Sequence, residues 1–241
     1  MTYIEGFLTP VPTANRDAYS AHAASAAPIL HDMGVVRMVE CWGDDVPRGK
    51  LNDMWGAVNA AEDETVVFSW FEYPDRATRN AAVEKMMNDP RMEEMGRSMP
   101  FDGRRMIWGG FASVSDQGDA NGTSYVDGVV MPVPATHHQA FADFARGVAS
   151  MFTENGATRV MDALGDDVKA GKVTDFQRAV RLEEGETVGY GWVEWPDKAT
   201  RDAGWERIMA DPRMQERVPP FDGKRMIFGG FVPILDDKGG A

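Results

Sequence analysis

Cysteine, net positive charge and long apolar runs are nearly absent from this sequence, and each shortage excludes a class of protein. Cys41 is the one cysteine among 241 residues, so neither an internal disulfide nor a cysteine-rich zinc site can form. Lysine and arginine number 25 against 38 acidic residues, and the net charge of -13 disfavours nucleic acids and anionic lipid surfaces as partners. The apolar stretch at residues 66–71 is too short to cross a bilayer, and the amino terminus lacks a signal-peptide pattern. We therefore expect a soluble cytoplasmic protein with no nucleic-acid and no membrane partner.

What the sequence does contain is one pattern that occurs twice. Residues 3–6 (YIEG) match residues 125–128 (YVDG), 122 positions later. Residues 100–103 (PFDG) match residues 220–223 (PFDG), 120 positions later, so a loop of the second copy is two residues shorter. Solenoid repeats are shorter and more numerous than this. Two long copies therefore indicate two equivalent modules.

The two copies define the expected domains. The first α+β module spans residues 1–113, a linker rich in Gly, Asp, Asn and Ser spans 114–124, and the second module spans 125–235. Residues 236–241 are expected to fray. Apolar spacing, prolines and capping residues predict the order β-α-β-β-β-α-β in each module. In the first copy the predicted strands are residues 3–9, 35–42, 51–60, 65–73 and 104–113. The predicted helices are residues 13–33 and 75–88.

This order is typical of a ferredoxin-like split βαβ module with one added strand. Its helices cover one face of the sheet, so the other face needs cover that the second copy can supply. The face predicted to meet the other module carries Val66, Phe68, Trp70 and Glu72, with Val188, Tyr190, Trp192 and Glu194 in the second copy. We therefore predict an α+β fold, two ferredoxin-like modules packed through their sheets as a single-chain dimeric α+β barrel. Because the modules pair within one chain, we expect a monomer.

Several motifs resemble the YbaA-like domain-of-unknown-function 1428 family. They are residues 40–47 (ECWGDDVP), 67–70 (VFSW), 89–92 (DPRM) and 99–103 (MPFDG). The resemblance implies a dimeric α+β barrel, usually built from two chains, and no established activity. Superfamily relatives include cofactor-independent oxygenases, haem-degrading enzymes and stress-related binding proteins, which is an analogy of fold alone. The second copy has Asp-Ala-Leu at residues 162–164 where the first has Glu-Cys-Trp, so the two inherited sites need not be equivalent.

The duplicated aromatic face supplies the candidate site. Glu72 and Glu194 lie two residues beyond a tryptophan, and a carboxylate among apolar walls can act as a base, which makes both weak catalytic candidates. A structural ion pair with arginine is favoured over catalysis as the explanation of these glutamates, and tryptophan is more often core than ligand contact. The candidate ligand-binding residues are Phe68, Trp70, Tyr190, Trp192, Arg37, Arg159, Arg105 and Arg225.

Metal and cofactor sites are not indicated. The four histidines, His22, His31, His137 and His138, have no histidine at the equivalent position of the other copy. The repeated Asp-Asp pair at residues 44–45 and 166–167 offers too few ligands for calcium and is typical of a turn. We therefore predict no metal and no cofactor.

Two hypotheses of different class remain. The first is a non-catalytic protein that binds a small-molecule ligand. The second is a cofactor-independent enzyme, oxygenase- or isomerase-like, acting on a small apolar substrate in a cavity between the modules. A cavity of ligand size, roughly 300 Å³ or more, separates a usable site from a filled core.

Overall fold

Eight strands form one closed barrel in the computed structural model, which describes residues 1–239. They are β1 (Tyr3–Pro12), β2 (Arg37–Asp45), β3 (Glu64–Tyr73), β4 (Ile107–Gly118), β5 (Tyr125–Pro134), β6 (Arg159–Asp167), β7 (Glu186–Trp195) and β8 (Ile227–Asp237). Their order around the barrel is β1-β3-β2-β8-β5-β7-β6-β4. The antiparallel pairs β2–β8 and β4–β6 join one module to the other. The predicted single-chain α+β barrel is confirmed.

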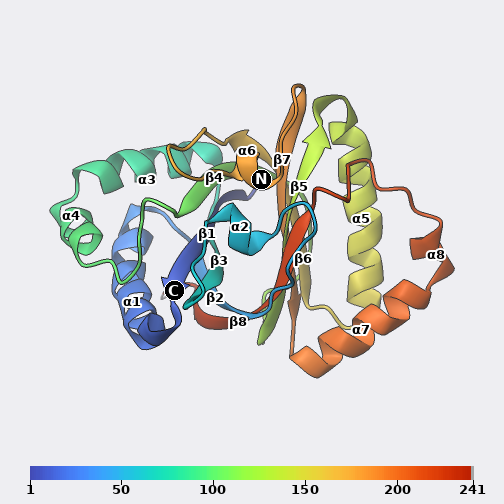
Figure 1. Ribbon diagram of the computed structural model, residues 1–241, viewed down its shortest axis with the longest axis horizontal. Helices are drawn as coiled ribbons and strands as arrows, with labels where there is room; N and C mark the ends of the chain where they lie inside the picture. Colours follow the sequence, from blue (N-terminus) through green and yellow to red (C-terminus); the bar gives the residue numbers. More distant parts are fainter. Residues whose placement is uncertain (240–241) are drawn as a thin grey trace.

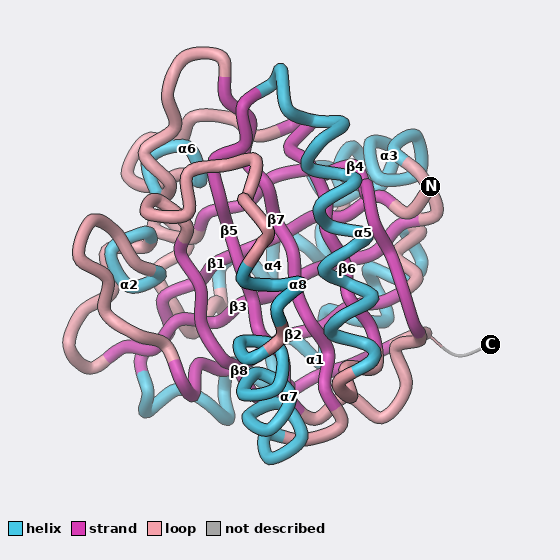
Figure 2. The backbone as a smooth tube through the Cα atoms, turned by 90° about the vertical axis from the view of Figure 1, so that its right-hand side faces the viewer, coloured by secondary structure: helices cyan, strands magenta, loops and turns pink. Residues whose placement is uncertain are grey.

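Each module contributes one set of helices that packs on the outside of the barrel. The first set is α1 (Arg16–Met33), α3 (Arg76–Asn88) and α4 (Pro90–Arg97), and the second is α5 (His138–Glu154), α7 (Lys198–Ala210) and α8 (Pro212–Gln215). Figure 1 shows the first set on the left and the second on the right, with strands between them. Figure 2 looks at the second module and shows α5 and α7 in front of the strands. Among residues 1–239, no helix combines the length and apolar character of a membrane span.

Local sequence signals explain most helix ends. The Asp75 side chain accepts a hydrogen bond from the Thr78 amide at 2.8 Å, so this aspartate caps α3 as predicted. Gly34 has φ of 113° at the end of α1, where a side chain would be strained. The first turn of the helix predicted at 13–33 is a 3₁₀ helix, Thr13–Asn15, after Pro12.

The predicted strand at residues 51–60 is wrong. This segment forms the short helix α2 (Met54–Ala57), because the Asp53 side chain accepts from the Gly56 amide at 2.7 Å and caps a helical turn. The second copy repeats the arrangement in α6 (Phe176–Ala179), capped by Asp175. Each module therefore contributes four strands, without the added one.

The pairs β2–β8 and β4–β6 form the two seams between the modules, and this pairing lengthens strands β4 and β8. β4 continues to Gly118, into the segment expected as linker, because its end pairs with β6. β8 continues to Asp237, whose carboxylate accepts from His31 Nε2 at 2.8 Å. The expectation that residues 236 and 237 fray is therefore wrong, and residues 240–241 lie outside the described residues.

Aromatic rings from both modules fill the barrel interior, as the alternating pattern of β3 and β7 predicted. Trp70 and Trp192 stack with ring centroids 4.2 Å apart, and Phe68 stacks on Tyr190 at 4.8 Å. Gly6 makes this possible, because a Cβ there would come within 2.8 Å of the Tyr190 ring. The opposite face of each strand lies under the helices, and the cavity described next forms there.

Candidate functional site

The predicted catalytic candidates Glu72 and Glu194 lie in a buried ion-pair network between the modules. The Arg37 guanidinium donates to Glu194 at 2.8 and 2.9 Å, and Arg159 donates to Glu72 at 2.7 and 2.9 Å. Burial alone would raise the pKa of Glu194, but the hydrogen bonds and charge of Arg37 hold that pKa below its ordinary value. Each arginine thus crosses from one module to the carboxylate of the other. The network forms a two-fold clamp across the barrel.

The other predicted ligand contacts have close partners within the protein. The Trp70 and Trp192 indole N–H groups donate to Glu72 at 3.1 Å and Glu194 at 3.0 Å. With their rings stacked at 4.2 Å, no ligand fits between them. Arg105 pairs with Glu64 at 2.6 Å, and Arg225 makes the same pair with Glu186 at 2.7 Å. Ligand binding by these residues stays a prediction, whereas the structure shows their hydrogen bonds and ion pairs with glutamates.

The repeated aspartate pairs also join the modules. Asp167 accepts from Arg79 of α3 at 2.6 Å. The equivalent contact in the other direction joins Arg201 of α7 to Asp45 at 3.3 Å, and the neighbouring Asp44 accepts from the Tyr125 hydroxyl at 2.9 Å and pairs with Lys198. These turns hold the start of the other module's helix. Within residues 1–239, no group of three or more His, Cys, Asp or Glu side chains is arranged to hold a metal ion.

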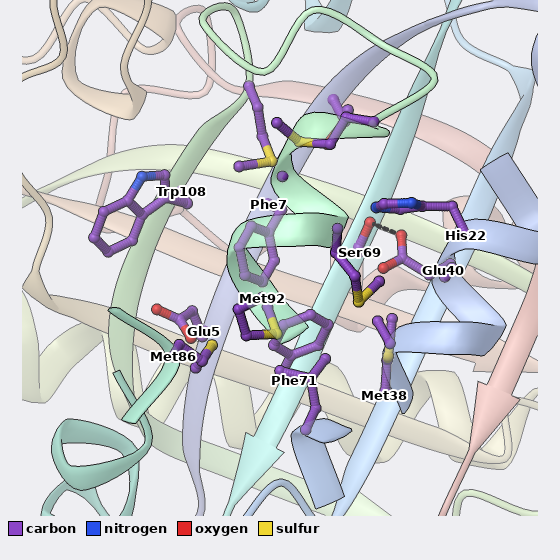
Figure 3. A pocket seen from close by; sticks show the side chains of 18 of the residues that line it. Glu5, Phe7, His22, Met38, Glu40, Ser69, Phe71, Met86, Met92 and Trp108 are labelled. Carbon is purple, nitrogen blue, oxygen red and sulfur yellow. Dashed lines mark hydrogen bonds between the residues drawn. The ribbon is translucent and has the colours of Figure 1, made fainter. Parts of the chain in front are cut away.

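A cavity of about 330 Å³ lies inside the first module, between the outer face of its sheet and helices α1, α3 and α4. Its walls are methionine and aromatic side chains, with Phe7 and Phe71 packed at 4.7 Å between ring centroids and Trp108 partly exposed. Figure 3 shows these rings and several methionines around the space, with Glu40, Ser69 and His22 on one side of it. A larger hollow of about 550 Å³, between residues 47–53 and 223–228, is lined mostly by exposed residues. The first cavity has the size and apolar walls of a small-molecule site.

Glu40 is the chemically distinctive group of this cavity. Strand β2 places it opposite Ser69 of β3, and only 5% of the residue is exposed. The Tyr19 hydroxyl donates to Glu40 Oε2 at 2.7 Å, and the Ser69 hydroxyl donates to the same oxygen. Burial raises the pKa of Glu40 to about 7, although these two hydrogen bonds lower it. Among residues 1–239 Glu40 has no cationic partner, and its Oε1 accepts no hydrogen bond from them.

A second carboxyl group on the cavity wall has a different environment. Glu5 pairs with Arg79 at 2.9 Å and accepts from the Tyr73 hydroxyl at 3.2 Å. Burial raises its pKa against the opposing charge of Arg79. For His22, burial lowers the pKa of the ring, because burial disfavours its charged form, and so favours the neutral ring. Glu40 is therefore the one of these groups that combines an unused oxygen with a pKa near neutrality.

The second module differs from the first at four cavity positions. Phe141 replaces Tyr19, and the Gly191 position has no hydroxyl to match Ser69. Asp162 stands for Glu40, is partly buried, and has a pKa raised to about 7 by desolvation. Trp205 takes the place of Val83 and donates to Asp127 at 2.8 Å. A carboxyl is kept, but the two hydroxyl donors are not, and Trp205 is far larger than Val83.

Sequence reasoning missed Glu40, although a signal was present. Glu40 and Asp162 are carboxylates at one position of both copies, in the middle of a β-rich segment. The alternation of β2 places that position on the face under the helices, where a charge is costly to bury. The prediction concentrated on the aromatic face instead, where tryptophan and glutamate recur together.

The fold and the cavity define a dimeric α+β barrel protein in which one chain replaces two. Its fold resembles a proposed monooxygenase from Lactobacillus acidophilus, with TM-score 0.60 and 12% identity over 100% of this chain and 97% of the other. It also resembles one from Fusobacterium nucleatum, with TM-score 0.58, 11% identity and coverage of 100% and 95%. An anthrone oxidase-like protein gives TM-score 0.53 and 8% identity over 100% and 94%. At these identities the likeness shows the fold alone.

The sequence comparison places the chain more narrowly. This chain belongs to the family described as protein of unknown function (DUF1428), whose model matches residues 2–103 and again 124–223. The uncharacterized protein YbaA of Escherichia coli K12 is 56% identical over 117 residues, which are 48% of this chain and 100% of that protein. The same values hold for YbaA of Shigella flexneri. One YbaA chain thus corresponds to about half of this one, and the family has no characterised activity.

Proposed function

We propose that this chain is a cofactor-independent enzyme, oxygenase- or isomerase-like, whose site is the cavity of the first module rather than the interface between modules. Its substrate is a small, neutral, largely apolar molecule with an acidic C–H group. One observation carries the proposal: a buried carboxyl without a cationic partner lines an apolar cavity of about 330 Å³. A pKa of about 7 for Glu40 matches what a general base needs at neutral pH.

The chemistry follows from the two oxygens of Glu40. Oε2 accepts from Tyr19 and Ser69, which fixes the carboxylate, and Oε1 remains for the substrate proton. Removing that proton leaves the electron pair delocalised on the substrate, which lies among apolar side chains. Return of the proton to a different carbon completes an isomerisation. Alternatively, dioxygen oxidises the carbanion, and a methylene group becomes a carbonyl with release of water.

Anthrone is a suitable first probe because it is flat, apolar and acidic at one methylene carbon, and one fold relative is named for this chemistry. With dioxygen, one anthrone gives one anthraquinone and one water. We expect the wild-type protein to accelerate this oxidation and Glu40→Gln to lower kcat/KM about a thousandfold. The measurement is anthraquinone absorbance together with oxygen consumption.

The matched control is Asp162→Asn, which removes the equivalent carboxyl of the second module and should change kcat/KM less than twofold. Equal losses in both variants would contradict a single site in the first module. No acceleration by the wild type, over anthrone and a panel of other aromatic carbon acids, would refute the enzymatic proposal.

Ligand binding without catalysis is the second candidate, favoured by the hydrogen bonds that already satisfy Glu40 Oε2. The uncharged fluorescent probe N-phenyl-1-naphthylamine separates the two candidates. We expect one probe molecule per chain, bound equally by the wild type and Glu40→Gln. Probe binding without turnover of any carbon acid would favour this second function.

A further inference from the structure

Methionines gather on one wall of the first module's cavity. Seven of the 16 methionines line it, which are Met38, Met86, Met87, Met92, Met95, Met99 and Met106. Five of them lie within residues 86–99, on the end of α3, on α4 and on the loop that follows. Figure 3 shows Met86 and Met92 beside Phe71, across the space from Glu40. We call residues 86–99 the methionine wall.

The second module keeps two of the five wall methionines, as Met209 and Met214, and lacks the other three. Ile208, Arg217 and Pro219 stand where Met86, Met95 and Met99 stand in the first copy. Gap filling in a core is the ordinary use of methionine, yet the three losses cluster around the end of α3 and around α4, where the corresponding helix α8 is also shorter. The full set of five wall methionines therefore occurs in the first module, whose sheet and helices enclose the 330 Å³ cavity.

Parts of the wall are open to dissolved oxidants. Met87 is 80% exposed and Met99 is 37% exposed, whereas Met86, Met92 and Met95 are half-buried and face the cavity. Exposure governs how fast a thioether reacts with peroxide. The single thiol offers no competing target, because Cys41 is fully buried and burial raises its pKa.

We propose that the methionine wall is a reversible oxidation site that closes the cavity to ligands. One hydrogen peroxide converts one thioether to a sulfoxide and is itself reduced to water. A dithiol reductant, acting through a methionine sulfoxide reductase, returns the thioether and releases a second water. The sulfoxide oxygen is a strong acceptor that an apolar wall cannot satisfy, so it turns outward with its helix or takes up the ligand's space. That oxidation would regulate an enzyme rests on the proposed function, whereas the closing of the cavity to ligands does not.

The test measures N-phenyl-1-naphthylamine binding by fluorescence before and after peroxide treatment of the full chain. Peptide mass spectrometry maps the sulfoxides in the same samples. We expect the Kd of the probe to rise at least about tenfold as sulfoxides appear in residues 86–99. Treatment with methionine sulfoxide reductases and dithiothreitol should restore the original Kd.

A variant with leucine at the five wall positions 86, 87, 92, 95 and 99 should bind the probe and keep its affinity after peroxide, since leucine matches methionine in volume. The control carrying Met209→Leu and Met214→Leu in the second module should stay sensitive. Should the five-leucine variant fail to fold, reductase recovery in the wild type decides. An unchanged Kd despite sulfoxides in the wall, or no recovery after their reduction, would overturn the proposal. Absence of probe binding before oxidation would instead refute the proposed cavity function.

Discussion

The two modules are alike where they meet and different where they could act. Across the seam each arginine binds the other module's glutamate with nearly equal distances, 2.8 and 2.9 Å from Arg37 and 2.7 and 2.9 Å from Arg159. Under the helices the pattern diverges at Tyr19, Ser69 and Glu40, which correspond to Phe141, Gly191 and Asp162. The seam keeps its symmetry because both halves must close one barrel.

This contrast teaches which residues the fold requires. Separate chains that dimerise carry identical sites, whereas fusion lets one copy change while the other keeps its groups. Asp162 retains part of the site, since burial raises its pKa to about 7 just as burial does for Glu40. A carboxyl alone does not make a site without donors that fix it and space beside it.

Truncation at the seam is the largest effect we expect on stability, and it should be the same in both modules. Glu194→Ala leaves the Arg37 guanidinium with Asp236 at 2.8 Å and a longer contact to Glu72 at 3.3 Å, and Glu72→Ala leaves Arg159 with Asp116 at 2.8 Å. Breaking a buried ion pair in this way costs about 3 to 5 kcal/mol of unfolding free energy. Urea denaturation monitored by tryptophan fluorescence measures it.

The milder changes Glu72→Gln and Glu194→Gln test ligand binding at the seam. If the network is structural, both variants lose stability and bind N-phenyl-1-naphthylamine with unchanged Kd. A large loss of probe affinity in either would return the site to the aromatic interior. Unequal destabilisation by the two truncations would break the symmetry on which the comparison rests.

The fold was readable from the sequence because it depends on repeated, strongly patterned segments. Alternation in β3 placed Phe68 and Trp70 inward, and two copies with one bare sheet face each predicted a barrel. Residues 51–60 were misread because their apolar content suits a strand, while the cap at Asp53 starts a helical turn. The Asp53 carboxylate accepts from the Gly56 and Gly49 amides and so caps this turn, and apolar periodicity carries no information about such a cap.

The candidate site was harder to predict because it depends on contacts distant in sequence. Tyr19, Glu40 and Ser69 come from α1, β2 and β3, and each alone has an ordinary explanation. Their meeting on one carboxylate oxygen follows only once the helix is placed over the sheet. Besides the carboxylate kept in both copies, the joint loss of Ser69 and Tyr19 in the second copy was a further sequence signal, since partners in one network tend to change together.

The protonation of Glu40 has the next largest expected effect on the free energy of unfolding. Its pH dependence can be compared with that of Asp162 in the second module. Its pKa of about 7 in the folded protein, against an ordinary 4.5, means that the folded state binds this proton more tightly. The stability it contributes is therefore complete below pH 4.5 and is lost as the pH rises through 7, by about 3 kcal/mol. Glu40→Gln removes this dependence, so its stability relative to wild type should improve between pH 4.5 and 8.

The measurement is urea denaturation of both proteins at intervals across that range, and Asp162→Asn should show the same direction. If both variants show this pH dependence, the two modules differ in the room around the carboxyl and in its hydrogen-bond donors, and not in the pKa of the carboxyl. A flat profile for Glu40→Gln relative to wild type would mean that this carboxyl titrates normally.

The smallest effect comes from exchanging single groups between the modules. Tyr19→Phe gives the first module the second module's aromatic residue and removes a 2.7 Å hydrogen bond to Glu40 Oε2. Because that bond favours the charged carboxylate, its loss raises the pKa of Glu40 and moves the rise of kcat/KM upward by about one pH unit, or about 1.4 kcal/mol. The reciprocal Phe141→Tyr should leave the pH profile of anthrone oxidation where it is. Should both variants shift the profile equally, the base would not be fixed by its own module, and the functional division between the two halves would fail.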